Sequence, residues 1–215
     1  MSVQDNDRLI AYFGYGSLVN LATLATPYVH AAPARLRGWR RHWQARPGDG
    51  LPERALLSVH RDDSCEIHGM LVFDVASSLT SLDERERHYE RVALAPEQLA
   101  VDCDRSPAML SALRAGDLFV YVGTTPVEGQ SPLVQSYLHT VMDGFFDSHG
   151  EAGLLAFMQT TRGFERDILE DRHAPHYPRM TDVPEDRRAR YDRLLREAGV
   201  RFAGDGAQRN PEAAQ

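Results

Sequence analysis

The segment Phe13-Gly14-Tyr15-Gly16-Ser17-Leu18 has the pattern best suited to holding a ligand. Two glycines separated by one residue allow close backbone approach and unusual φ angles. An apolar start at 9–11 indicates a short strand leading into this turn, with Ser17 at the N-cap of a short helix. The first N–H groups of a helix lack partners, so the turn suits a carboxylate or carbonyl oxygen. A plain strand-to-helix turn explains the same spacing, and the pattern alone favours that interpretation.

Glu86 is the second candidate for chemistry. In the stretch 79–90 the apolar residues recur at helical spacing and share one face with Glu86. A carboxylate on that face points at the core, where burial raises its pKa and suits it to act as general base and acid near neutral pH. A partly buried glutamate paired with Arg85 or Arg91 is an equally good interpretation.

Other polar clusters have simpler explanations. The range 35–46 mixes arginines with two tryptophans, as single-strand nucleic-acid binders do, but its period-two spacing favours a strand. Asp171, His173 and His176 are possible metal ligands, yet two prolines make their segment an irregular loop, and we expect no metal there. The charged stretch 187–196 is most simply a solvated helix.

The composition removes several classes of enzyme. All 24 positively charged residues are arginines, whereas Schiff-base, PLP and Walker-type chemistry needs a lysine. Cys65 and Cys103 are too few for a thiolate zinc cluster or a disulfide framework, and acidic neighbours of Cys103 oppose thiolate formation. The net charge of −7 argues against a phosphate-driven affinity for nucleic acid. A polar N-terminus and the lack of a long apolar run predict a cytoplasmic protein without a membrane partner.

The periodicity changes along the chain. After residue 123 the apolar period becomes 3.6, which predicts a helix that begins at Ser131 and Pro132 and ends at Gly150. A second helix is expected to stop near Gly163. Before residue 123, short stretches rich in Val, Leu, Phe, Tyr or Trp predict strands at 35–44, 54–59, 66–75, 89–94 and 117–122.

Strands and helices are interleaved at first and then segregated, which favours an α+β fold over a doubly wound α/β sheet. We expect a small, mostly antiparallel β-barrel with flanking helices and a C-terminal helical extension. The domain is predicted to span 8–180, with its barrel core at about 10–123 and its helical part at about 131–165. A surface helix at 181–202 and a disordered tail at 203–215 are expected to follow.

The turn 13–18, followed by Leu82-Asp83-Glu84-Arg85-Glu86 and then Tyr89-Glu90-Arg91, resembles the gamma-glutamylcyclotransferase-like superfamily. The resemblance covers roughly 10–123, and the segments 171–173 and 177–179 are similar to C-terminal extensions of some bacterial members. It implies a small β-barrel with flanking helices. It also implies a cofactor-free enzyme that converts a gamma-glutamyl amine or amino acid to 5-oxoproline and the free amine.

The resemblance also implies roles for individual residues. Glu86 matches the family's essential glutamate, which acts as general base and acid. In the family a glycine often follows this glutamate, whereas Arg87 does here, which leaves the local helix end open. A glutathione-specific enzyme and a non-catalytic small-molecule-binding module remain alternatives, and the oligomeric state stays open. The residues implied to bind the substrate are Tyr15, Gly16, Ser17, Leu18 and Tyr89.

Overall fold

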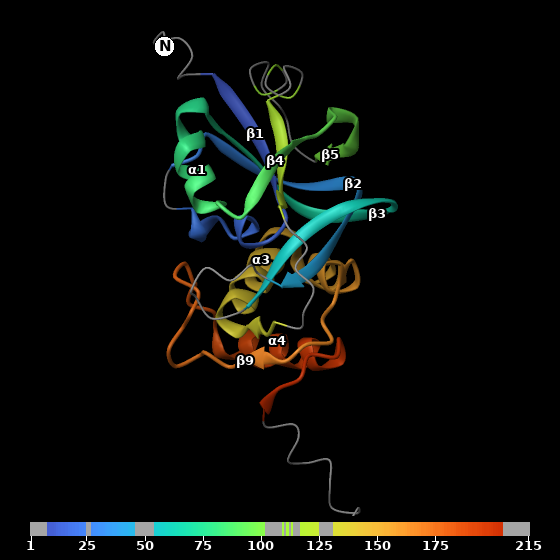
Figure 1. Cartoon of the computed structure of the whole chain (residues 1–215), viewed down its shortest axis with the longest axis vertical. Coiled ribbons are helices and arrows are strands. Elements are labelled where there is room, and N and C mark those ends of the chain that lie inside the picture. Colours follow the sequence, from blue (N-terminus) through green and yellow to red (C-terminus); the bar gives the residue numbers. More distant parts are fainter. Residues whose placement is uncertain are drawn as a thin grey trace, which may run out of the picture.

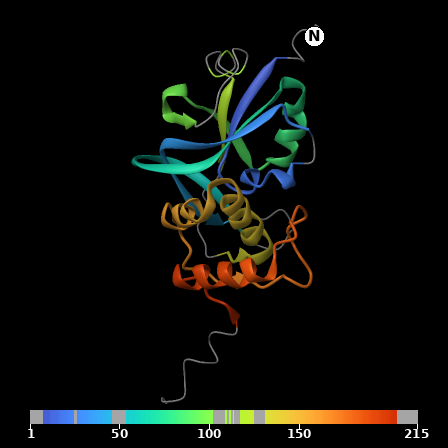
Figure 2. The same cartoon turned by 180° about the vertical axis from the view of Figure 1, so that it is seen from behind.

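The computed structural model describes residues 8–24, 27–45, 54–101, 109, 111, 113, 117–124 and 131–203 of the chain. A curved sheet forms one layer, and two long helices form a second layer below it (Figures 1 and 2). The described residues before 125 supply most of the sheet, and those from 131 onward supply the helical layer. This segregation confirms the predicted α+β class.

The main sheet has the strand order β4-β6-β1-β3-β2-β5, with β8 also pairing with β2. Within the described residues, β1 with β6 and β2 with β8 are the parallel pairs, and the remaining pairs of this sheet are antiparallel. Strand β1 lies between two neighbours, and its residues from Ile10 to Phe13 are almost fully buried because both faces are covered. This strand delivers the chain into the Gly14–Ser17 turn. The strand bounds are β1 Leu9–Gly14, β2 His30–Ala45, β3 Ala55–Val75, β4 Tyr89–Ala93, β5 Leu99–Val101, β6 Leu118–Gly123 and β8 Thr161–Arg162.

The long hairpin of β2 and β3 connects the two layers (Figure 1). Its ladder is interrupted where Arg37 pairs with Glu66 and Trp39 pairs with Arg61. Gly38 lies at this point with a φ of 80°, a left-handed conformation that favours glycine. The interruption bends the hairpin, so one half stays in the sheet while the other half packs against the helical layer.

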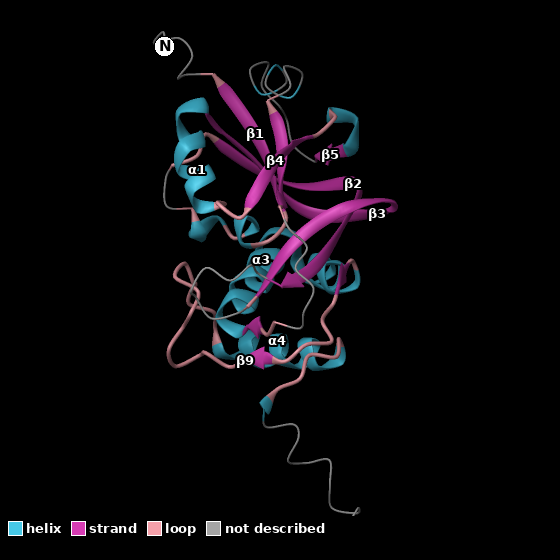
Figure 3. Ribbon diagram, in the orientation of Figure 1, coloured by secondary structure: helices cyan, strands magenta, loops and turns pink. Residues whose placement is uncertain are grey.

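The helical layer consists of α3 (Gln135–Gln159), α4 (Glu185–Glu197) and a two-stranded sheet of β7 (Leu133–Val134) and β9 (Ile168–Leu169) (Figure 3). Gly150, with a φ of 63°, kinks α3 at the position where the sequence predicts a helix end. Helix α4 buries Tyr191 and Leu195, and the Tyr191 hydroxyl donates to Asp143 of α3 at 2.9 Å. One face of the expected solvated helix is therefore anchored. No helix within the described ranges has the length and apolar character needed to cross a membrane.

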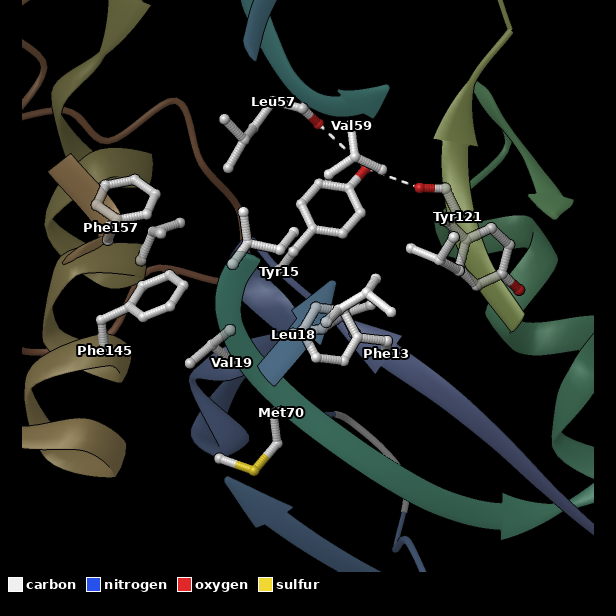
Figure 4. Close-up of a cluster of buried hydrophobic side chains, with 14 of the residues drawn as sticks. Phe13, Tyr15, Leu18, Val19, Leu57, Val59, Met70, Tyr121, Phe145 and Phe157 are labelled. Carbon is white, nitrogen blue, oxygen red and sulfur yellow. Dashed lines mark hydrogen bonds between the residues drawn. The ribbon is translucent and has the colours of Figure 1, made fainter. Parts of the chain in front are cut away.

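The apolar core is continuous from the sheet into the helical layer. Figure 4 shows Phe13 of β1 and Leu57 and Met70 of β3 in the same cluster as two phenylalanines of α3. Those two rings, Phe145 and Phe157, stack with their centroids 4.7 Å apart, so the two segments of α3 on either side of Gly150 pack on each other.

Three expectations about the sheet are wrong. The expected barrel is not closed, because the described strands form an open sheet with β4 and β5 at its edges. The outer half of the β2–β3 hairpin packs on α3 rather than closing the sheet; there Trp43 meets Tyr137 edge-on at 6.0 Å. The strands predicted at 54–59 and 66–75 form one strand, β3, whose exposed polar middle was mistaken for a loop. The strand β5 was also missed, because it has only three residues.

The helix predicted over 79–90 is shorter than expected. Helix α1 (Leu79–Arg85) follows a 3-10 turn, η4 (Ala76–Ser78), and ends before Glu86, which lies at its C-cap with φ −100° and ψ 30°. Tyr89 instead begins β4, because it pairs with Gly123 of β6. Similarly, β7 replaces the first turn of the helix expected from Ser131, and α3 begins at Gln135.

The two tryptophans in 35–46 are core residues. Trp39 is 2% exposed and Trp43 is 4% exposed, so neither ring is available for stacking on a nucleobase. This burial supports the strand interpretation over the nucleic-acid interpretation. Cys103 and residues 204–215 of the expected tail lie outside the described residues.

A buried arginine lies where the hairpin meets α3. The Arg41 guanidinium donates to the His68 carbonyl at 2.7 Å and to the hydroxyls of Thr160 and Thr161 at 2.7 and 3.1 Å. Burial lowers the pKa of Arg41 to about 9. The rings of His68 and His149 stack with their centroids 5.1 Å apart. Burial is the main cause that lowers the pKa of both imidazoles, and the charge of Arg41 lowers it further.

We therefore expect the protein to lose stability in mild acid through this histidine pair. The unfolded chain binds protons at the usual histidine pKa near 6.5, whereas the folded chain binds them only at lower pH. The stabilising contribution is complete above about pH 6.5 and is lost as the pH falls through the lowered pKa. Urea unfolding between pH 8 and 5 measures this slope. His68→Phe should flatten it, whereas His173→Gln, in an exposed loop, should keep it; an unchanged slope in His68→Phe would contradict the assignment.

Candidate active site

A cavity of about 310 Å³ opens where the two layers meet. Its walls come from the turn at Ser17, the start of β3 at 54–56, the segment 84–89, the start of α3 and the loop 177–179. Its volume lies within the range of small-molecule sites. A smaller cavity of about 30 Å³, large enough for one water molecule, lies next to it. Ser17, Glu86, Tyr89 and Tyr137 line both cavities.

Glu86 is placed at the junction of these two cavities. Its side chain is 16% exposed, and burial raises its pKa above the usual glutamate value. The charges of Arg85 and Arg179 act in the opposite direction and limit the rise. Glu86 is thus partly buried, and its raised pKa agrees with the first interpretation, whereas its partial exposure agrees with the alternative of a paired glutamate. Glu86 lies at the C-cap of α1, so its side chain does not belong to the apolar face of a helix, as the sequence spacing had indicated.

Arg85 holds this carboxylate in place. Its Nε donates to Glu86 Oε1 at 3.0 Å, so Arg85, and not Arg91, is the ion-pair partner of Glu86. Its other nitrogens donate to the Thr23 carbonyl at 2.9 Å, the Thr23 hydroxyl at 3.1 Å and the Ser17 hydroxyl at 3.3 Å. The catalytic candidate and the glycine turn are therefore joined by a single guanidinium.

The turn itself differs from the expected geometry. Gly16, rather than Ser17, is the N-cap of a 3-10 helix, η2 (Ser17–Val19), and its φ of −126° lies outside the left-handed region. A second 3-10 helix, η3 (Leu21–Thr23), follows, capped by the Asn20 side chain. Glycine is needed at 16 for space, because a Cβ there would lie 2.8 Å from the Tyr137 hydroxyl oxygen.

The other expected substrate-binding side chains have structural partners. The Tyr15 hydroxyl donates to the Tyr121 carbonyl at 2.8 Å (Figure 4), and Leu18 packs in the core. The Tyr89 hydroxyl donates to the Leu57 carbonyl at 2.9 Å. Tyr15, Leu18 and Tyr89 line the inner cavity together with Gly16 and Glu86.

Residues of the helical layer that the sequence patterns do not single out complete the candidate site. Tyr137 was interpreted only as part of an apolar helix face, although burial raises its pKa and keeps its hydroxyl protonated as a donor. Tyr177 and Arg179 come from the loop whose resemblance to family extensions was the one available signal. The possible metal ligand Asp171 instead accepts hydrogen bonds from the Ser136 backbone and hydroxyl at 2.8 and 2.6 Å.

Comparisons with known proteins identify the fold. No protein-family profile and no curated protein matches this sequence. Among solved structures, a gamma-glutamyl cyclotransferase is similar, with 15% identity, a TM-score of 0.51, and coverage of 86% of this chain and 99% of the other. The human protein loc79017 has 14% identity, a TM-score of 0.50 and the same coverage. YkqA from Bacillus subtilis has 15% identity and a TM-score of 0.54 over 75% of this chain, which spans only 58% of YkqA. These similarities show a gamma-glutamyl cyclotransferase-like fold.

The contact between the turn and α3 leads to a test. Gly16→Ala should destabilise the protein by about 1–3 kcal/mol, because the new methyl group overlaps the Tyr137 hydroxyl. Tyr137→Phe removes that oxygen, so the double variant should be more stable than the sum of the single effects predicts. Urea unfolding of the four proteins measures the coupling. Strictly additive effects would show that Tyr137 does not limit the space above Gly16.

Proposed function

We propose that the protein is a gamma-glutamyl cyclotransferase that releases 5-oxoproline and a free amine from a gamma-glutamyl substrate. The observation that carries this proposal is a largely buried glutamate with a raised pKa, facing a substrate-sized cavity beside a glycine turn. The similarity in fold to a gamma-glutamyl cyclotransferase supports the same reaction. The sequence resemblance, whose motifs contain Glu86 and the turn, agrees with it.

The reaction needs little beyond positioning and proton transfer. The substrate's α-amine attacks its own γ-carbonyl carbon, a new C–N bond closes the five-membered ring, and the amide C–N bond to the leaving amine breaks. Glu86 takes the proton released from the attacking nitrogen and returns one to the leaving nitrogen. Because the reacting atoms belong to one molecule, proximity is already supplied, and the proposed mechanism uses no cofactor or metal.

The other residues of the site have supporting roles in this mechanism. Backbone N–H groups of the Tyr15–Leu18 turn, together with the Tyr137 hydroxyl, are suited to hold a carboxylate or a developing oxyanion. Tyr89 supports the site from the inner wall through its bond to Leu57. Arg85 is a positioning residue, since it contacts Glu86 and the turn and shares its charge with both.

A substrate panel tests the activity. The purified protein is incubated with gamma-glutamyl amino acids, gamma-glutamyl amines and glutathione, and 5-oxoproline is measured. Turnover restricted to glutathione would identify the glutathione-specific alternative. Binding without 5-oxoproline formation would identify a non-catalytic binding module and overturn the proposed activity.

Glu86→Gln should fold normally and lose at least about 10² in kcat, the usual effect of removing a proton-transfer group. Glutamine is nearly isosteric, so the packing of the site should survive. Glu90→Gln is the matched control, because Glu90 is exposed on β4 and outside both cavities. Wild-type turnover by folded Glu86→Gln would remove Glu86 from the mechanism.

The pH profile should report the balance of charge around Glu86. As a base it must be deprotonated, so activity falls as the pH drops through its raised pKa. Arg85→Gln removes the main charge that opposes this rise, and it should move the acidic limb of kcat/KM to higher pH. Arg193→Gln, exposed on α4, should leave the limb in place. An unmoved limb in active Arg85→Gln would show that another group titrates.

A further inference from the structure

A separate cavity of about 90 Å³ lies between β1, β3, α1 and the loop that carries Arg179. It shares Arg85 and Arg179 with the 310 Å³ cavity, but neither Glu86 nor the Gly14–Ser17 turn lines it. Because one water molecule needs about 15 Å³, the cavity has room for about six atoms of that size. The proposed reaction makes no use of this space.

Tyr12 and Asp74 enter the cavity from the same face of the sheet. Ile10 of β1 pairs with Asp74 of β3 in an antiparallel ladder, so these two side chains lie on one face. Tyr12 is two positions after Ile10 and therefore shares that face. The strand register thus places a hydroxyl and a carboxylate as diagonal neighbours, and both line the cavity.

The carboxylate of Asp74 is buried, with 2% exposure, and only one of its oxygens is satisfied. Its Oδ1 accepts from the Val75 backbone N–H and from the Ser78 hydroxyl, each at 2.8 Å. Within the described part of the chain, no group donates to Oδ2 and no cation forms an ion pair with Asp74. A buried carboxylate is costly without a charged partner, so this oxygen is suited to an ammonium group.

The hydroxyl of Tyr12 is the second buried group without a partner. The residue is 1% exposed, and its hydroxyl makes no hydrogen bond with another described residue. Burial, followed by the charge of Asp74, raises the pKa of Tyr12, so the hydroxyl stays neutral. Its ring packs on Phe119 with the centroids 6.0 Å apart, which holds the side chain in place. The hydroxyl oxygen is free to accept a hydrogen bond from a ligand.

The two arginines supply positive charge to the same cavity. Four of the five N–H groups of Arg85 have acceptors, and its Nη1, which donates to the Thr23 carbonyl at 2.9 Å, keeps one free hydrogen. Arg179 forms no hydrogen bond or ion pair with any other described residue. The loop before it is fixed, because Asp171 accepts from the His176 backbone N–H at 2.7 Å. Both guanidinium groups are therefore suited to a carboxylate.

The charges of the cavity select the ligand. A simple cation pairs with Asp74 but meets two arginines, and a simple anion pairs with Arg179 but meets a buried carboxylate. A molecule that carries both an ammonium and a carboxylate group satisfies both sides. The volume limits it to about six non-hydrogen atoms, which is the size of glycine or alanine.

We propose that this cavity is a binding site for a small zwitterionic amino acid. The ammonium group donates to Asp74 Oδ2 and to the Tyr12 hydroxyl oxygen, and the carboxylate accepts from Arg179 and from the free Nη1 hydrogen of Arg85. The site is separate from the proposed active site, and its occupation does not depend on the cyclotransferase reaction.

Calorimetry of the full-length protein at neutral pH tests the ligand class with glycine, L-alanine, L-leucine, methylamine and acetate. We expect glycine and alanine to bind at one site. Methylamine and acetate should each bind at least about tenfold more weakly, because each lacks one of the two charged contacts. Leucine should not bind, because its side chain exceeds the volume. The proposal is wrong if neither glycine nor alanine binds saturably at millimolar concentration, or if methylamine, acetate or leucine binds as tightly as they do.

Variants locate the bound amino acid. Tyr12→Phe keeps the ring and should raise the Kd for glycine about tenfold, and Asp74→Asn, which keeps an acceptor for Val75 and Ser78, should abolish binding. Tyr177→Phe is the matched control, because Tyr177 lines only the 310 Å³ cavity. Weaker binding of glycine to Tyr177→Phe together with unchanged binding to Tyr12→Phe would place the ligand in the other cavity and contradict the proposal.

A charge variant tests the orientation of the ligand and does not depend on the folding of Asp74→Asn. Arg179→Gln should raise the Kd for glycine about tenfold and leave the weak binding of methylamine unchanged, because only glycine has a carboxylate. Arg193→Gln, an exposed arginine outside the cavity, is the control. Unchanged binding of glycine to folded Arg179→Gln would exclude the carboxylate contact. These measurements need no turnover, so their result stands whether or not the protein forms 5-oxoproline.

Discussion

The guanidinium of Arg85 is the contact on which the geometry of the candidate site depends. It reaches the carboxylate of Glu86, the hydroxyl of Ser17 and both oxygens of Thr23. These residues come from the end of α1 and from two 3-10 helices more than sixty positions earlier. With its side chain only 9% exposed, the arginine makes these bonds where an unpaired charge is costly. The carboxylate and the turn are therefore held in one fixed arrangement.

The same contact determines how reactive Glu86 is. Burial alone pushes the carboxylate toward its neutral form, and the nearby cations of Arg85 and Arg179 pull it back toward the charged form. A group that must accept a proton and then return it works best between these extremes.

The helical layer completes a site that the sheet begins. The sheet layer supplies the turn, Glu86 and the start of β3, while α3 and the loop after it supply the opposite wall. Tyr137 contacts the turn directly, and Asp171 fixes the loop to the start of α3. The kink at Gly150 lets α3 continue as a second segment whose Phe157 packs on the hairpin side of the core. The contacts of α3 and its following loop with the sheet layer therefore both stabilise the interface and shape the cavity.

The sequence by itself determined the α+β class, the kink at Gly150 and the two segments that carry Glu86 and the glycine turn, because each leaves a local pattern of apolar spacing or glycine. It placed Glu86 on the inner face of a helix, whereas the helix ends before that residue and β4 begins three positions after it. Only the tertiary structure decided that β3 is continuous and the sheet open. Only the tertiary structure placed Tyr137 over Gly16 and Arg179 beside Glu86. Such contacts join residues about a hundred positions apart, and they leave no period in the chain because they depend on how two layers pack.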